Sequence, residues 1–193
     1  MGITHKEYFE NIYDILFTPF EFFKRNDLTV SLRQAAGTVL WVSLFTIIGS
    51  AIASGEIFNN LFISFLIICK IFIILVAWTF TGLFLEYIAK IFSRECGLNT
   101  VLFYTSFAMV PYIFFAPLDV LKKSGDAGYT IGTIAEMFLY FWIIILYVNA
   151  IKKSYNISIA RSFMMILLPF IGTFFAISWA IGFFTKMVYI NSI

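Results

Sequence analysis

The chain has 193 residues, of which 61% are hydrophobic and 12% are charged, and its mean hydropathy is +0.93. A soluble domain carries roughly 25% charged residues, so this chain has too little polar surface to cover a soluble globule of its size. Its net charge of +2 is too small to indicate a nucleic-acid partner. The composition therefore predicts an integral membrane protein whose main partner is the lipid bilayer.

The first expected element is an amphipathic segment within residues 1–34. In residues 8–16, aromatic and aliphatic side chains recur near helical spacing, with charged residues on the other side. Pro19 suits the first position of a short helix, and Thr18 suits its N-cap. The residues typical of an interfacial anchor are Pro19, Phe20, Phe22, Phe23, Lys24 and Arg25. Two interpretations stay open: the segment lies in the cytoplasmic headgroup layer, or it packs on the inner ends of the spans.

Five apolar runs are long enough to cross a bilayer as helices, which takes about 20 residues each. They cover 35–53, 61–89, 101–118, 128–150 and 162–185. Because the runs lack the alternating polarity of membrane strands, the expected fold class is an all-α integral membrane protein. The predicted division of the chain is an N-terminal segment, 1–34, followed by a five-helix transmembrane domain, 35–193.

The lysine and arginine residues predict an orientation, because these residues gather in cytoplasmic loops. With the N-terminus inside, the inner segments hold Lys6, Lys24, Arg25, Arg33, Lys90, Arg94, Lys152, Lys153 and Arg161. The outer segments hold Lys122, Lys123 and Lys186. The N-terminus is therefore expected in the cytoplasm and the C-terminus outside.

Two opposite charges, Lys70 and Glu136, lie within the apolar runs at a similar predicted depth. A charge at the bilayer centre costs at least about 2.5–3.5 kcal/mol and marks a possible functional site. Three interpretations stay open for Lys70. Lys70 either extends its ammonium to the outer interface, or forms a structural pair with Glu136, or lies with Glu136 on a solute path.

Two prolines interrupt the third run, at positions 111 and 117. Proline has no backbone N–H and breaks a helix interior. Pro111 is expected to kink the span and Pro117 to end it, with Asp119 already outside. A neighbouring helix, or a hydroxyl such as that of Thr105 or Ser106, would satisfy the carbonyl that Pro111 leaves without a donor. The kink either fits the shape of the bundle or opens a cavity.

The fifth run carries small residues every four positions, Gly172, Ala176 and Ala180. Close packing at small residues helps helices associate in lipid, so this stripe predicts a contact with another helix or with a second copy of the chain. Catalytic motifs are missing from the sequence, and His5 is its only histidine. No enzymatic activity, metal or cofactor is therefore expected.

Several of these features occur together in one family. An interfacial "ILFTPFEFFKR" precedes the spans, the third span carries "YTSFAMVPYIFF", and Arg161 opens the last span. The chain resembles the Yip family of five-span Ypt/Rab-interacting membrane proteins, and in particular its short bacterial members. The third-span motif of that family corresponds here to Tyr104, Ser106 and Pro111, with Thr105 between the tyrosine and the serine. The long soluble N-terminal region of the eukaryotic members is missing, so Rab binding is not carried over.

The resemblance implies a role in trafficking or membrane organisation. The chain is expected to be a non-enzymatic protein of a bacterial inner membrane that organises the membrane or partner proteins. These partners would be other membrane proteins or further copies of the chain. The alternative is a small-solute or ion transporter, or a transporter subunit, that uses Lys70, Glu136 and the Pro111 kink. A wet cavity around the two charges would favour transport, and a dry pair would favour the organising role.

Overall fold

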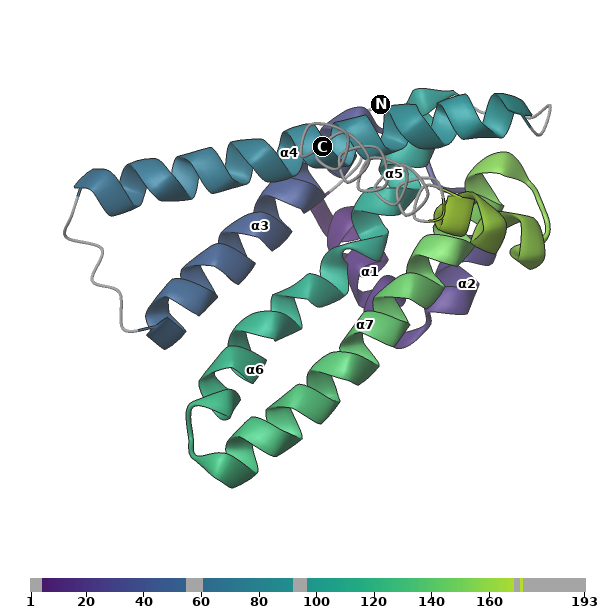
Figure 1. The fold of residues 1–193 in the computed structure, drawn as a ribbon. Helices are drawn as coiled ribbons and strands as arrows, with labels where there is room; N and C mark the ends of the chain where they lie inside the picture. The colour runs from purple at the N-terminus through teal and green to yellow at the C-terminus, as the bar shows by residue number, and fades with distance from the viewer. Residues whose placement is uncertain (1–4, 55–60, 92–96, 169–170, 172–193) are drawn as a thin grey trace, which may run out of the picture.

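The computed structural model describes residues 5–54, 61–91, 97–168 and residue 171. Every regular element in these ranges is a helix (Figure 1). Two short helices open the chain, α1 (His5–Phe17) and α2 (Pro19–Lys24). The longer elements are α3 (Leu32–Ser54), α4 (Leu61–Ile91), and α7 (Asp126–Tyr155), together with a span built of α5 (Leu98–Ala108), the 3₁₀ helix η1 (Val110–Phe114) and α6 (Phe115–Lys122). The predicted all-α membrane fold is confirmed.

Four stretches are long and apolar enough to cross a membrane, namely Leu32–Ala53, Ser64–Ile91, Leu98–Lys122 and Asp126–Tyr155. They coincide with the first four predicted spans to within a few residues at each end. A shorter apolar helix, Ile159–Leu168, begins where the fifth span was expected. Most of the predicted run 162–185 lies outside the described residues, so the count of five spans stays a prediction.

The interrupted span is the centre of the bundle. It contacts α3, α4 and α7 (Figure 1). In its most apolar stretch 67% of the residues are buried, against 11% in α4. The eight consecutive residues from Val101 to Ala108 are all buried. The sequence of this span therefore has to fit protein neighbours on every side.

Pro111 breaks the span as predicted. The α-helix ends at Ala108, and the chain continues as a 3₁₀ turn in which the Tyr112 N–H donates to the carbonyl of Met109 at 2.9 Å. The hydroxyls of Thr105 and Ser106 do not bond the backbone groups at the break, because they donate to carbonyls of the preceding turn at 2.7 Å. A neighbouring helix does contribute, since the Thr46 hydroxyl lies 3.2 Å from the Tyr112 carbonyl oxygen.

The expectation for Pro117 was wrong. Because the break lets a new helix start at Phe115, Pro117 falls in the first turn of α6, where its N–H would have no partner within the helix. The helix therefore continues to Lys122. Asp119 lies inside α6, and its carboxylate accepts a hydrogen bond of 2.8 Å from Ser50 of α3.

Close helix contacts form at glycines in the described part of the chain. A Cβ at Gly49 of α3 would clash with the Cβ of Ala116 in α6. A Cβ at Gly132 of α7 would lie 2.7 Å from the Cγ of Lys122. The predicted stripe of Gly172, Ala176 and Ala180 lies outside the described residues, and its role stays a prediction.

Candidate functional site: a basic cleft beside the N-terminal elbow

Arg25 holds the N-terminal helices together. Its guanidinium donates to the Asp14 carboxylate of α1 at 2.8 Å and to both Asp27 oxygens at 3.2 Å. It also donates to the side-chain oxygen of Asn11 at 3.4 Å. The hydrogen bond from Arg25 lowers the pKa of Asp27 below its usual value. We call α1, α2 and residues 25–27 the N-terminal elbow.

The inner face of the elbow is inserted into the bundle core. Phe22 and Phe23 are 0% and 6% exposed. The Phe22 ring lies 5.1 Å from that of Phe107, and the Phe23 ring lies 6.2 Å from that of Tyr104. The Tyr8 hydroxyl forms a 3.0 Å hydrogen bond with Thr38 of α3. The elbow is thus packed on the spans.

This packing corrects the predicted interfacial anchor at three of its six residues. Phe22 and Phe23 contact α5 instead of lipid, and Arg25 is engaged by carboxylates. An aromatic ring is buried favourably by lipid or by protein, so composition alone does not choose between the two. Phe20 and Lys24 are exposed and Pro19 is partly exposed, which leaves them available to lipid.

The predicted family motif lies where the elbow docks. Tyr104 is buried against Phe23, and Ser106 is fully buried with its hydroxyl on the carbonyl of Phe103. Pro111 is buried three residues after α5 ends. The N-terminal aromatic pair therefore contacts the third span at Tyr104 of the motif and at Phe107 beside it, which the sequence could not indicate.

The outer face of the elbow is an aromatic stripe. Phe9, Tyr13, Phe17 and Phe20 are between 58% and 68% exposed. The first three are four residues apart, so they lie along one side of α1, and the rings of Tyr13 and Phe17 are 4.6 Å apart. The sequence pattern placed Phe9 and Tyr13 on one apolar face with Tyr8, Ile12 and Leu16, because helical spacing alone does not show which part of such a face is buried.

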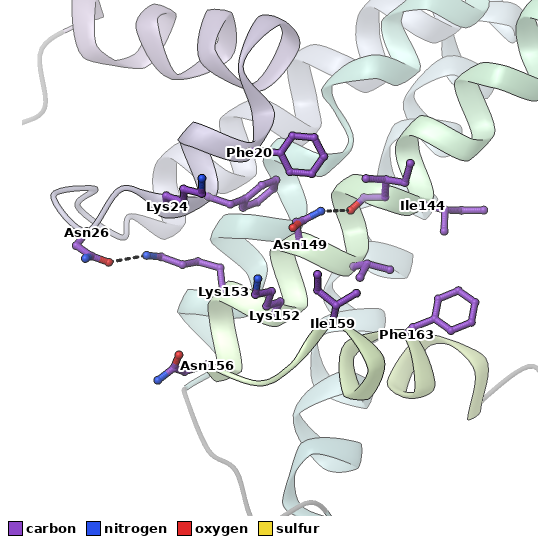
Figure 2. Close-up of a pocket in the computed structure, with 13 residues that line it drawn as sticks. Phe20, Lys24, Asn26, Ile144, Asn149, Lys152, Lys153, Asn156, Ile159 and Phe163 are labelled. Carbon is purple, nitrogen blue, oxygen red and sulfur yellow. Dashed lines mark hydrogen bonds between the residues drawn. The ribbon is translucent and has the colours of Figure 1, made fainter.

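A cleft of about 800 Å³ opens between α2, the end of α7 and the helix Ile159–Leu168 (Figure 2). Asn156 ends α7 in the left-handed conformation, with a φ of 50°. Asparagine tolerates this conformation, which turns the chain back along α7. The residues that line the cleft are Phe20, Phe23, Lys24, Asn26, Ile144, Ile145, Val148, Asn149, Lys152, Lys153, Asn156, Ile159 and Phe163.

One edge of this cleft is cationic. Lys24 comes from α2, and Lys152 and Lys153 come from the last turn of α7. Figure 2 shows the Lys153 ammonium donating to the Asn26 side-chain oxygen, at 2.6 Å. None of the described lining residues is acidic. Sequence analysis placed these lysines in inner segments but gave no sign that α2 and α7 bring them together.

The predicted pairing of Lys70 with Glu136 was wrong. Glu136 forms its ion pair with Lys122 of α6, and both side chains are about one-fifth exposed. Lys122 was expected outside the span because Pro117 was expected to end it. Since α6 continues and Gly132 leaves room for the Lys122 stem, this ammonium reaches Glu136. Lys70 is exposed on α4.

The transporter alternative loses its main support with that pair. Neither Lys70 nor Glu136 lines this cleft or the smaller hollow of about 410 Å³ beside Ala160 and Met164, and Pro111 is buried. The same ranges contain no cluster of three His, Cys, Asp or Glu side chains that could hold a metal ion.

One comparison with known proteins identifies a family. Residues 13–181 match the family model described as the Yip1 domain. The match covers both sides of the elbow contact, Phe22 and Phe23 on α2 and Tyr104 and Phe107 on α5. Neither a curated protein nor a solved structure matches the chain.

Proposed function

The chain belongs to the Yip1 domain family, and we propose that it is a non-enzymatic protein that organises membrane or partner proteins through its N-terminal elbow. The family is not an enzyme family, and the apolar helices place the chain in contact with the lipid bilayer. The elbow surface, rather than a reaction centre, is the part of the molecule that we expect to act.

The observation that carries this proposal is the two-sided elbow. Its inner aromatics are fixed in the core, while Phe9, Tyr13 and Phe17 face outward. A surface that is already ordered loses less conformational entropy when a partner binds it. Exposed aromatic side chains are also enriched where partners bind most strongly. The elbow therefore has the properties of a preformed docking surface for other membrane proteins or further copies of the chain.

We place this surface on the cytoplasmic side of a bacterial inner membrane. The elbow end of the bundle carries Lys24, Arg25, Lys90, Lys152 and Lys153, whereas the turn between α6 and α7 follows Lys122 and Lys123. The excess of basic residues at the elbow end supports an N-terminus inside. The expected position of the C-terminus, outside, falls on residues that the structure does not describe.

Blue-native electrophoresis of mildly solubilised membranes would test the organising role. We expect the wild-type chain to migrate in complexes larger than the monomer, and the triple variant Phe9→Ser, Tyr13→Ser, Phe17→Ser to lose them. The control Ile134→Ser changes an exposed apolar residue of α7 away from the elbow and should keep the complexes. Unchanged complexes in the triple variant, with its melting temperature preserved, would refute the proposal.

A further inference from the structure

We propose that the basic cleft binds an anionic phospholipid, with the phosphate at the lysine edge and the start of an acyl chain along α7. This inference deepens the proposed function and rests on it for the choice of the elbow end as the working surface. The ligand class follows from the order of the lining side chains, from their charge, and from the place of the cleft on a membrane-spanning helix.

The charge of the cleft favours an anion. Lys24, Lys152 and Lys153 all line the cleft, and the Lys153 ammonium donates to the neutral amide of Asn26. Nearby carboxylates are engaged elsewhere: Arg25 binds Asp14 and Asp27. Glu21 is exposed on α2 and does not line the cleft. The edge therefore keeps an excess of positive charge to which a phosphate group is complementary.

A purely structural account explains only part of this arrangement. Lysines in the last turn of a helix interact favourably with its dipole, and this applies to Lys24 in α2 as well as to Lys152 and Lys153 in α7. It does not explain why the C-terminal ends of two separate helices line the same cleft.

The apolar wall favours a lipid over a water-soluble phosphate compound. Ile144, Ile145 and Val148 line the cleft within the apolar run of α7. Ile159 and Phe163 line it from the returning helix (Figure 2). From Lys152 to Ile144 the helix rises roughly 12 Å, at 1.5 Å per residue. A ligand in this cleft thus meets cations first and then, beyond Asn149, a wall of hydrocarbon side chains, which is the order of groups in a phospholipid.

The size of the cleft agrees with this assignment. Its volume of about 800 Å³ lies within the roughly 300–1,000 Å³ typical of ligand pockets. Such a volume accommodates a headgroup and the upper part of a chain, while the rest of the lipid remains in the bilayer. Basic pockets between membrane helices bind anionic headgroups elsewhere by the same physical means.

Native mass spectrometry of the full-length detergent-purified chain would test the proposal. The probes are phosphatidylglycerol, phosphatidylcholine and glycerol 3-phosphate, which separate the anionic lipid from a neutral lipid and from a soluble phosphate. We expect phosphatidylglycerol to bind most tightly. Lys152→Gln and Lys153→Gln should each weaken its binding about fivefold, the usual contribution of one basic residue near an anionic membrane.

Matched variants distinguish binding in this cleft from binding to any positive charge or any apolar surface of the protein. Lys90→Gln removes a lysine from the last turn of α4, outside the cleft, and should leave the affinity unchanged. Ile145→Trp fills the wall with every lysine intact and should weaken binding, whereas Ile134→Trp, on the same helix outside the cleft, should not. Melting temperatures would show that each variant is folded.

Three results would overturn the proposal. They are equal binding of phosphatidylcholine, an equal loss of affinity in Lys90→Gln and Lys152→Gln, and binding of glycerol 3-phosphate as tight as that of phosphatidylglycerol. The last would assign the site to a soluble phosphate compound. Phe9, Tyr13 and Phe17 do not line the cleft, so failure here would leave the electrophoresis result of the organising role intact.

Discussion

Single residues decide which charges meet inside this bundle. Lys122 and Glu136 pair because Gly132, one turn before Glu136 on α7, leaves room for the lysine stem. Lys70 was an equally good candidate by depth along its helix. Depth does not give the rotation of a helix about its axis, and rotation determines which side chains face each other.

The first prediction concerns this ion pair. Lys122→Met and Glu136→Gln should each lower the free energy of unfolding in detergent by about 1–3 kcal/mol, because each leaves a partly buried charge without its partner. The double variant should recover much of the loss, giving a coupling energy in a double-mutant cycle. Lys70→Met combined with Glu136→Gln is the control and should give additive effects. Coupling of Lys70 with Glu136 instead would contradict the structure.

Among the elements, the interrupted span depends most on its neighbours. Its break packs against α3, which adds a second donor to the Tyr112 carbonyl beside the Phe115 N–H of the span itself. The hydroxyl of Thr46 is shared between the Tyr112 carbonyl at 3.2 Å and the Val42 carbonyl at 2.8 Å. The contact of α3 with α6 then depends on Gly49.

The second prediction tests the bond across the break. Thr46→Val should lower the free energy of unfolding by about 0.6 kcal/mol, the average for a hydrogen bond between membrane helices. Thr81→Val is the matched control, because the Thr81 hydroxyl bonds the Ala77 carbonyl of its own helix at 2.8 Å and is exposed. Equal losses in the two variants would show that the bond to Tyr112 contributes nothing.

The third prediction tests the close approach of α3 and α6. Gly49→Ala should lower the free energy of unfolding by about 1–3 kcal/mol, because the new methyl group clashes with Ala116 and forces the helices apart. Gly37→Ala lies on the same helix with nothing within 4 Å of the new Cβ. It should be neutral or slightly stabilising, since alanine is the better helix former. Thermal unfolding in detergent would compare them, and a harmless Gly49→Ala would refute the packing.

Across the whole molecule, the elements could be predicted and their contacts could not. Hydropathy placed four spans to within a few residues, and the chemistry of proline placed the break at Pro111. Pro117 was misjudged because its effect depends on where the next helix begins, which the break resets. The place of Phe22 and Phe23, in the interface or packed on the spans, stayed open because lipid and protein are equally apolar neighbours. The cleft was missed because it joins residues from α2, α7 and the helix that follows.

The contacts of the elbow with the spans explain why an N-terminal segment belongs to a membrane domain. The elbow contacts α5, η1 and α7, so it is packed on the spans rather than attached as a separate unit. Its inner aromatics complete the core around Phe107, and Phe20 and Lys24 border the cleft. Both proposals for this end of the molecule require the elbow to be docked.

Hydrogen exchange of the α1 amides, measured by mass spectrometry on the full-length chain in nanodiscs, tests this docking most directly. The account predicts slow exchange in the wild type and in Phe20→Ala, which changes an exposed ring of α2. Phe22→Ala should make the α1 amides exchange much faster, because losing a buried phenylalanine costs about 3–5 kcal/mol and releases the elbow. Fast exchange of α1 in the wild type, or exchange unchanged by Phe22→Ala, would contradict the docked elbow.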